Sequence, residues 1–218
     1  MSRPLLLDLF CGAGGSAVGY HRAGFDVVGV DINPQPNYPF EFVQADALAY
    51  LLVCGRHYDA FHASPPCQTF TAYRRRGGGV GDAYENLIPL TRTGLRSRSK
   101  PYVIENVPGA PLHDPITLCG SMFGLDVRRH RLFESNVPLT APACDHGVWT
   151  ERKYPQATNR ANRRFTCEVG VYRIPLDVQK RAMGVDWNVT LHELSEAIPP
   201  SYTEFIGIQL MQHVRPVA

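Results

Sequence analysis

The sequence predicts an α/β fold built on a mainly parallel sheet, with a small insert late in the chain. Two observations predict it: short apolar runs alternate with helix-patterned segments, and glycine-rich or polar turns separate them. The chain has 218 residues, enough for one sizeable domain and only marginally enough for two. A hydrophobic content of 44% with 19% charged residues is ordinary for a globular protein and argues against extensive disorder.

The first strand–helix–strand unit lies at the N-terminus. Leu5–Phe10 is an apolar run that predicts a buried strand, Gly12–Gly15 is a glycine turn, and Ser16–Ala23 has a helical pattern. A second strand is expected at Val27–Val30, ending in Asp31. A helix between two neighbouring strands makes those strands parallel.

The same alternation recurs as far as the last long strand. Ala45–Leu52 follows a short extended segment, and the further expected elements are strands at Tyr58–Ala63, Tyr102–Ile104 and Leu132–Phe133 and a helix at Glu85–Ser97. A mainly parallel sheet follows from this order.

A shift in composition after residue 137 predicts an inserted module. Pro138–Arg173 is polar, proline-dotted and rich in arginine, whereas helical patterning returns at Asp177–Met183 and at Tyr202–Val214. We therefore expect a main domain at residues 1–137, an insert at 138–173, and a C-terminal segment at 174–218 that packs back on the main domain.

Bulk properties exclude several classes of protein. The N-terminal segment has neither the shape of a signal peptide nor the length of a spanning helix, so a cytoplasmic protein without a membrane partner is expected. Six cysteines without a Cys-x-x-Cys pair make a disulfide framework improbable. The net charge of +2 is too small to indicate a polyanion partner by itself. Local clusters of basic residues are equally consistent with phosphate binding and with solvated surfaces; they lie at Arg74–Arg76, Arg92–Lys100, Arg128–Arg131 and Arg152–Arg164.

Three strand ends carry residues suited to holding a nucleoside. Glycines in Asp8-Leu-Phe-Cys-Gly-Ala-Gly-Gly15 allow a ligand to approach the backbone, and Asp31 stands where an acid can hold a ribose. These features fit a nicotinamide-dependent oxidoreductase nearly as well as a methyltransferase, and a tight turn with a capping aspartate also explains them. Asp46, in Gln44-Ala-Asp-Ala47, adds a carboxylate that could accept a hydrogen bond from an adenine amine.

This spacing resembles that of the class I methyltransferases, and Asp8–Gly15 resembles the donor-binding motif of the cytosine-5 DNA methyltransferases, as in a small bacterial or phage member. The resemblance implies a class I S-adenosylmethionine-dependent methyltransferase fold, with S-adenosyl-L-methionine as methyl donor. It implies donor contacts at Phe10, Cys11, Gly12, Ala13, Gly14, Gly15, Asp31, Ile32, Asp46, Ala47, Pro66, Leu87, Glu196, Ala197 and Ile198.

A candidate nucleophile follows the strand expected at Tyr58–Ala63. In Ala63-Ser-Pro-Pro-Cys-Gln-Thr-Phe70, a proline-stiffened loop would hold Cys67 at the carboxyl edge of the sheet. A thiolate there could add to carbon 6 of cytosine, which makes carbon 5 nucleophilic. An aromatic residue at this position would instead indicate methylation of an exocyclic amine. Cys67 therefore favours methylation at carbon 5 over methylation of an exocyclic amine.

Two further motifs complete the resemblance to the catalytic site. Ile104-Glu-Asn-Val107 resembles the family's glutamate motif, which implies that Glu105 bonds the ring nitrogen and amine of cytosine as a protonated group with a raised pKa. Arg128-Arg-His-Arg-Leu-Phe133 resembles its arginine motif and implies roles for Arg129 and Arg131, although Val127 replaces a glutamine.

Two late segments also match the family. The stretch from Ile174 to Trp187 resembles a structural motif that follows the recognition region. Ser195-Glu-Ala-Ile-Pro-Pro200 resembles the segment that returns to the donor, with Glu196 in place of asparagine.

The substrate implied by the resemblance is double-stranded DNA, bound by a monomer that serves restriction, protection or phage modification. We expect the loop Arg74-Arg-Arg-Gly-Gly-Gly79 to act as a lid and the short insert to read about two to four base pairs. The expected DNA-binding residues are Gln68, Arg74, Arg75, Arg76, Arg160, Arg163 and Arg164.

A metal site is not predicted. Cys144, His146 and the distant Cys167 form an incomplete and irregularly spaced ligand set for zinc. Besides the cytosine-5 enzyme, three alternatives stay open: an exocyclic-amine methyltransferase, a nicotinamide-dependent oxidoreductase, and a catalytically silent nucleic-acid-binding relative.

Overall fold

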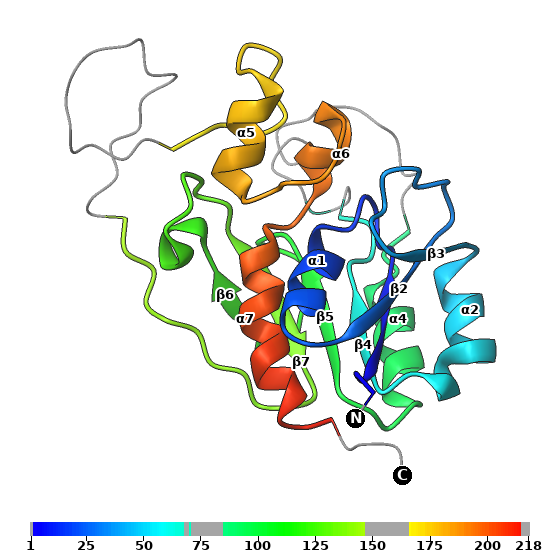
Figure 1. The fold of residues 1–218 in the computed structure, drawn as a ribbon. Coiled ribbons are helices and arrows are strands. Elements are labelled where there is room, and N and C mark those ends of the chain that lie inside the picture. The colour runs from blue at the N-terminus through cyan, green and yellow to red at the C-terminus, as the bar shows by residue number, and fades with distance from the viewer. Residues whose placement is uncertain (1, 68–69, 71–84, 147–165, 215–218) are drawn as a thin grey trace.

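The protein is built around one seven-stranded sheet with helices on both faces (Figure 1). The computed structural model describes residues 2–67, 70, 85–146 and 166–214. The strands are β1 (Leu5–Leu9), β2 (Asp26–Asp31), β3 (Glu41–Gln44), β4 (Ala60–Ala63), β5 (Tyr102–Asn106), β6 (Ile116–Leu118) and β7 (Arg131–Ser135). The helices are α1 (Gly15–Arg22), α2 (Ala47–Cys54), α4 (Ile88–Arg96), α5 (Leu176–Met183), α6 (Leu191–Glu196) and α7 (Pro200–Met211), with short 3₁₀ turns η1 (Gly55–His57) and η3 (Gly120–Phe123).

The sheet is mainly parallel, which confirms the predicted fold class. Its strand order is β3-β2-β1-β4-β5-β7-β6, and the pairs β1–β2, β1–β4, β2–β3 and β4–β5 are parallel. Strand β7 is antiparallel to both β5 and β6. The carboxyl ends of β1, β2, β4 and β5 therefore meet at one edge of the sheet, where open α/β folds bind their ligands.

The C-terminal helix α7 lies against α1 on one face of the sheet (Figure 1). Glycines allow the close approach: a methyl group on Gly19 would stand 2.0 Å from the hydroxyl oxygen of Thr203, and one on Gly207 would stand 2.6 Å from Cβ of Ala23. Thr203 also donates a hydrogen bond to the carbonyl of Ser16 at 2.9 Å. Residues nearly 190 positions apart are thus fixed together beside the N-terminal turn of α1.

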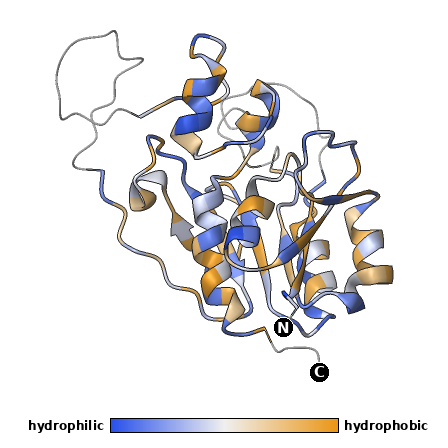
Figure 2. Cartoon of the chain, in the orientation of Figure 1, coloured by the Kyte–Doolittle hydropathy of each residue, from blue (hydrophilic) through white to orange (hydrophobic). Residues whose placement is uncertain are grey.

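Apolar clusters lie on both sides of the sheet. Figure 2 shows hydrophobic residues along the strands between them. One cluster joins α1 and α7 to the sheet through Tyr20, Tyr202 and Ile206, and the other packs α2 and α4 on the opposite face through Leu51 and Leu95. In the part of the chain that the structure describes, no helix is both long and apolar enough to span a membrane.

Some elements differ from the sequence prediction. Phe10 is not the end of the first strand, because it adopts a left-handed conformation (φ 56°) that begins the glycine turn. Helix α4 begins at Ile88 rather than at Glu85. The side-chain carbonyl of Asn86 accepts a hydrogen bond from the N–H of Ile88 at 3.1 Å, at the start of the helix. Strand β6 and helix α6 were not predicted from the sequence, because three and six residues are too few to display a period.

Candidate active site

The glycine turn after β1 is held open by its own backbone and by the next strand. Gly12 and Gly14 have φ angles of 49° and 89°, which side chains rarely adopt. Asp31, at the end of β2, accepts a hydrogen bond from the N–H of Gly12 at 3.1 Å and another from the N–H of Asn33 at 2.9 Å. Among the described residues, none lies within 4 Å of a Cβ atom placed on Gly12, so this part of the structure leaves space beside the backbone for a ligand.

The loop between α6 and α7 packs directly on this turn. A Cβ atom on Gly15 would stand 2.5 Å from the carbonyl oxygen of Ile198 and 3.3 Å from Cβ of Ala197. The indole of Trp187 donates a hydrogen bond to the carbonyl of Ala13 at 2.9 Å. The segment expected to return to the donor therefore does lie beside the glycine turn. Glu196 is exposed there and pairs with His192 at 3.7 Å.

Other residues expected to contact the donor have varied surroundings. Cys11 packs its side chain in the main core, and its backbone is engaged within the fold: its N–H donates a hydrogen bond to the carbonyl of Val30, and its carbonyl accepts one from the N–H of Gly14, both at 3.2 Å. The carboxylate of Asp46 accepts a hydrogen bond from the N–H of Ala49 at 2.8 Å and caps α2, so one of its oxygens is committed to the helix. Ile32 is 65% exposed directly after β2. Ala47 is buried, whereas Pro66 and Leu87 are half-buried.

Asp8 is a buried acid beneath the turn that the sequence analysis did not single out. Its carboxyl accepts a hydrogen bond from the hydroxyl of Ser16 at 2.8 Å. Burial raises the pKa of Asp8 well above its ordinary value, and the nearby Asp31 raises it further. The group is therefore kept closer to its neutral form than a surface aspartate, consistent with a structural role under the glycine turn.

The candidate nucleophile and the candidate acid leave adjacent strands. Leu9 of β1 pairs with Ala63 of β4, and Ala63 pairs in turn with Ile104 of β5. The loop carrying Cys67 therefore starts beside the glycine turn on one side and beside Glu105 on the other.

Glu105 forms a buried ion pair with Arg131 across the β5–β7 ladder. The Nε atom of Arg131 lies 3.1 Å from Oε1 of Glu105, and the side chains are only 14% and 7% exposed. Burial raises the pKa of the Glu105 carboxyl above its ordinary value, although Arg131 and a hydrogen bond from Ser64 oppose the shift. Protonation of Glu105 is thus easier than for a carboxyl in water.

The thiol of Cys67 responds to the same charges. Burial raises its pKa above the ordinary value, the charge of Glu105 raises it further, and Arg131 lowers it. These couplings bring Cys67, Glu105 and Arg131 into one electrostatic group. The thiolate needed for nucleophilic attack is favoured by Arg131 and opposed by an ionised Glu105.

Supporting contacts hold this group in place, and the sequence analysis assigned none of them. The amide of Asn106 donates a hydrogen bond to the carbonyl of Pro65 at 2.9 Å, which ties the end of β5 to the Cys67 loop. The hydroxyl of Ser64 lies 3.0 Å from Nε2 of His62. Nδ1 of the same ring lies 3.0 Å from the hydroxyl of Tyr20. Burial lowers the pKa of His62 to about 3, so its ring is neutral. Of these residues, Asn106 alone could have been identified from the sequence, because it is adjacent to Glu105.

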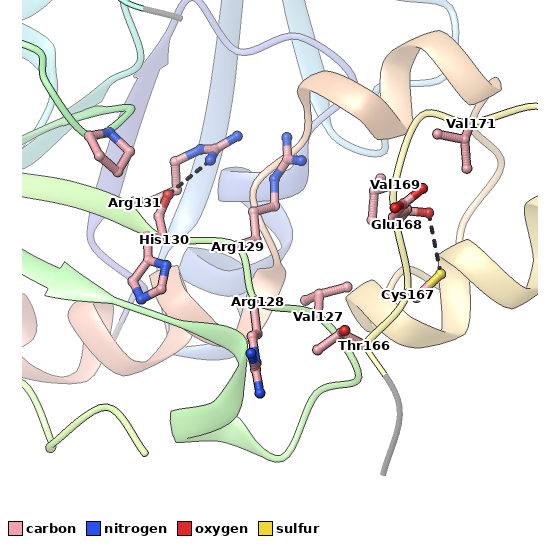
Figure 3. A pocket seen from close by; sticks show the side chains of 11 residues that line it. Val127, Arg128, Arg129, His130, Arg131, Thr166, Cys167, Glu168, Val169 and Val171 are labelled. Atoms are coloured by element: carbon pink, nitrogen blue, oxygen red, sulfur yellow. Dashed lines mark hydrogen bonds between the residues drawn. The ribbon is translucent and has the colours of Figure 1, made fainter. Parts of the chain in front are cut away.

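Arg129 occupies the same side of its chain segment as Arg131, whereas Arg128 and His130 point the other way (Figure 3). Arg129 donates a hydrogen bond to the carbonyl of Ser195, and its own carbonyl accepts one from the hydroxyl of Tyr202 at 2.7 Å. Burial and the charge of Arg131 lower the pKa of Arg129 to about 9, which leaves it protonated at neutral pH.

A pocket of about 990 Å³ lies between this arginine segment and residues 166–171 (Figure 3). Arg129 and Arg131 belong both to its lining and to the candidate catalytic group, whereas Cys67 and Glu105 do not line it. Val127, which stands where the resembling family has glutamine, is buried in an apolar cluster that also includes Ala13. The expected DNA-binding residues Gln68, Arg74, Arg75, Arg76, Arg160, Arg163 and Arg164 lie outside the described residues.

Comparisons with known proteins agree with this architecture. No protein-family model matches the chain. It is 33% identical over 126 residues to the type II methyltransferase M.XorII of Xanthomonas oryzae, covering 50% of this chain and 29% of that protein. It is 28% identical over 166 residues to the type II methyltransferase M.AgeI of Thalassovita gelatinovora, covering 67% of this chain and 37% of that protein. The chain thus spans about a third of the length of these curated relatives.

Solved structures show the same fold. DNMT2 of Spodoptera frugiperda superposes with a TM-score of 0.63 at 14% identity, covering 95% of this chain and 99% of that one. The Dnmt2 methyltransferase of S. pombe gives a TM-score of 0.61 at 14% identity, covering 96% and 98%. The chain therefore has the class I S-adenosylmethionine-dependent methyltransferase fold and is similar in sequence to type II methyltransferases.

Proposed function

We propose that the protein is a DNA (cytosine-5)-methyltransferase that uses Cys67 as its nucleophile. The observation that carries the proposal is the buried Glu105–Arg131 ion pair at the end of β5, beside the loop that carries Cys67. Burial raises the pKa of the Glu105 carboxyl in that pair. The pair and the loop stand at strand ends adjacent to the glycine turn. The similarity to proteins named type II methyltransferases supports methyl transfer.

The residues around the glycine turn fit S-adenosyl-L-methionine. The open space at Gly12 and the exposed side chain of Ile32 after β2 suit a nucleoside, and Asp31 retains acceptor capacity for ribose hydroxyls after its two backbone hydrogen bonds. In this proposal Ala197 and Ile198 close the other side of the turn. When bound, this donor supplies an electrophilic methyl group.

Cys67 starts the proposed reaction on the cytosine. Its thiolate forms a bond to carbon 6, and the electron pair of the C5–C6 double bond moves onto carbon 5 and the ring. After carbon 5 has gained the methyl group, it loses its proton to water. The resulting electron pair restores the double bond, and the carbon–sulfur bond breaks to release Cys67 as a thiolate.

Glu105 and the arginines stabilise the electron-rich ring in this scheme. Protonated Glu105 donates a hydrogen bond to the ring nitrogen while its other oxygen accepts one from the exocyclic amine, which favours cytosine over thymine. Arg131 orients the carboxyl through the 3.1 Å contact. Arg129, which stays charged, would meet the base's carbonyl oxygen.

The alternatives explain fewer of these contacts. An exocyclic-amine methyltransferase needs a stacking ring where this chain has Cys67, and a nicotinamide-dependent oxidoreductase has no use for the Glu105–Arg131 pair beside a thiol. A catalytically silent relative would not need a buried carboxyl of raised pKa, which costs folding free energy when ionised. The covalent chemistry therefore distinguishes the proposal from all three.

The test is a covalent trap with duplex DNA that contains 5-fluorocytosine. Fluorine replaces the proton that carbon 5 must lose before the carbon–sulfur bond can break, so an active enzyme supplied with donor should stay bonded to the DNA through Cys67. We expect a complex resistant to denaturing electrophoresis with the wild type and with the matched control Cys54→Ser, but none with Cys67→Ser. A wild-type protein that methylates cytosine without forming this complex would refute the role of Cys67.

The proposed target is a short sequence in double-stranded DNA. The insert at residues 138–173 offers few side chains for reading base edges, which supports a recognition site of about two to four base pairs. Bisulfite sequencing of plasmid from an otherwise unmodified expression host measures the site directly. Methylation confined to a long palindrome would overturn the proposal of a short site.

A further inference from the structure

Four side chains with metal-binding atoms converge behind the arginine segment. The sulfurs of Cys119 and Cys144 and ring nitrogens of His130 and His146 all lie within 4.8 Å of one another. The Nε2 atom of His146 is 2.9 Å from Sγ of Cys144 and 3.3 Å from Sγ of Cys119. The Nε2 atom of His130 is 3.5 Å from Sγ of Cys144.

We propose that Cys119, His130, Cys144 and His146 bind a structural zinc ion. Zinc in such sites is tetrahedral, with bonds of about 2.3 Å to sulfur and about 2.0–2.1 Å to nitrogen. These bond lengths place sulfur and nitrogen ligands about 3.6 Å apart. The spacings of 3.3 and 3.5 Å lie close to that value, whereas the 2.9 Å contact between His146 and Cys144 is about 0.7 Å shorter. Those two side chains must therefore move apart for the coordination shell to close.

The composition of the cluster selects this metal. Two cysteines with two histidines are a ligand set typical of zinc, whereas calcium and magnesium prefer oxygen ligands. Four protein ligands also leave no open position, which indicates a structural rather than a catalytic ion. A disulfide between the two cysteines would leave both histidines without a purpose in the cluster, and Cys119 and Cys144 are free thiols in this structure.

Neighbouring groups are arranged as they are around zinc thiolates. The hydroxyl of Ser121 lies 3.4 Å from Sγ of Cys119 and 3.5 Å from Sγ of Cys144, so it can donate to a thiolate. Arg128 donates a hydrogen bond to the carbonyl of His146 at 3.1 Å, which fixes the backbone of the last ligand. Such contacts orient metal ligands in known sites.

The ion would join three separate segments of the chain. Cys119 lies between β6 and η3, His130 directly precedes β7, and Cys144 and His146 lie in the segment after β7. His130 stands between Arg129 and Arg131 and points away from them (Figure 3). In the context of the proposed function, zinc would hold the arginine segment from behind and anchor the start of the insert.

From the sequence, Cys144 and His146 had only the distant Cys167 as a further ligand, and no metal site was predicted from this incomplete set. Cys167 is not a member of the cluster; its sulfur instead contacts the carbonyl of Glu168 at 3.4 Å. The two missing ligands are Cys119 and His130, which become neighbours through the antiparallel β6–β7 pair.

Metal content of the purified full-length chain tests the proposal. After expression in zinc-supplemented medium and gel filtration under reducing conditions, elemental analysis should find about one zinc ion per chain. Cobalt bound in place of zinc should give the intense visible absorption of tetrahedral Co²⁺ and a thiolate charge-transfer band. Cys144→Ser and His146→Ala should lose both signals, with circular dichroism reporting whether each variant is folded.

The matched controls are Cys54→Ser and Cys67→Ser, which should retain zinc and the cobalt spectrum. Wild-type protein without stoichiometric zinc and without the cobalt spectrum would overturn the proposal. So would zinc retained in both cluster variants, or zinc lost equally in Cys54→Ser. Because Cys67→Ser abolishes the covalent trap and should leave zinc in place, failure of the metal site and failure of the proposed catalysis are separate outcomes.

Discussion

Replacing Gly15 with alanine should separate the α6–α7 loop from the glycine turn. Gly15 has no positive φ angle, so alanine is not excluded by backbone strain; the obstacle is the carbonyl oxygen of Ile198, 2.5 Å from the new Cβ. That approach is about 0.9 Å inside the 3.4 Å at which ordinary contact begins. Backbone atoms cannot swing aside, so the loop must move by nearly this amount.

The expected cost can be estimated for folding and for turnover. Overpacking of this kind costs about 1–3 kcal/mol of unfolding free energy, which lowers the melting temperature by about 2–4 °C per kcal/mol in a chain of this size. A displacement near 1 Å beside a reacting group can reduce turnover by about a hundredfold. We therefore expect a modest loss of stability and a large loss of methylation in Gly15→Ala.

Thermal unfolding, calorimetric binding of S-adenosyl-L-homocysteine, and methyl incorporation into DNA measure the three effects. Gly94→Ala is the matched control: it also adds a methyl group to a helix, but its nearest neighbour is the flexible end of Leu51 at 3.0 Å. This control should change stability by no more than about 1 kcal/mol and leave turnover unchanged. If Gly15→Ala matched the wild type in stability, binding and turnover, the inferred packing of Ile198 on the turn would be refuted.

Two further predictions concern charge. At alkaline pH, where Glu105 is ionised, Glu105→Gln should lower the pKa of Cys67 and accelerate alkylation of this thiol by iodoacetamide, by about tenfold for each pKa unit. The control Glu196→Gln should have a weaker effect, because the carboxylate of Glu196 is exposed to solvent. Mass spectrometry measures the alkylation rate, and an unchanged rate in Glu105→Gln would contradict the electrostatic coupling of Glu105 to Cys67. Glu134→Ala should reduce unfolding free energy by about 3–5 kcal/mol, because it leaves Arg92 buried without the partner that it contacts twice at 2.7 Å. Burial raises the pKa of Glu134, but hydrogen bonding to Arg92 outweighs it and holds the pKa below its ordinary value. The stabilisation is therefore present above about pH 4.3 and is lost as pH falls through the folded-state pKa. Denaturant titrations at neutral and acid pH should show that the difference in unfolding free energy between wild type and Glu134→Ala becomes smaller in acid.

The sequence predicted the parallel part of the fold because that part is made of local patterns. Each strand-to-helix turn is contiguous, and β1, α1 and β2 can be read from apolar periodicity and the glycines between them. The positions of the candidate nucleophile and acid were predicted for the same reason, since Cys67 follows β4 and Glu105 lies near the end of β5, whereas their roles were predicted from the resemblance to the cytosine-5 DNA methyltransferases. Sequence order was enough to bring them to one edge of the sheet.

Contacts between distant segments could not be predicted in this way. The antiparallel arrangement of β7 between β5 and β6 depends on pairing, which leaves no periodic signal in a three-residue strand such as β6. The same pairing brings Cys119 beside His130 and makes a complete ligand set from an incomplete one. Asp46 illustrates a different difficulty, because a carboxylate at a helix start serves equally as a ligand contact and as a cap.

The chain around β7 serves two sites because side chains on an extended segment alternate in direction. Arg129 and Arg131 point to one side of the segment, where Arg131 pairs with Glu105, and His130 between them points to the other side (Figure 3). A ligand bond to His130 would act on the backbone that carries both arginines, whereas a contact farther from this segment would not. The position of the proposed zinc ion therefore has a mechanical reason: the Glu105–Arg131 pair depends on where the start of β7 lies, and the hydrogen bonds of the antiparallel ladder begin only at Arg131. A zinc bond to His130 would therefore restrain the residues directly before Arg131, which lie outside the ladder of the sheet.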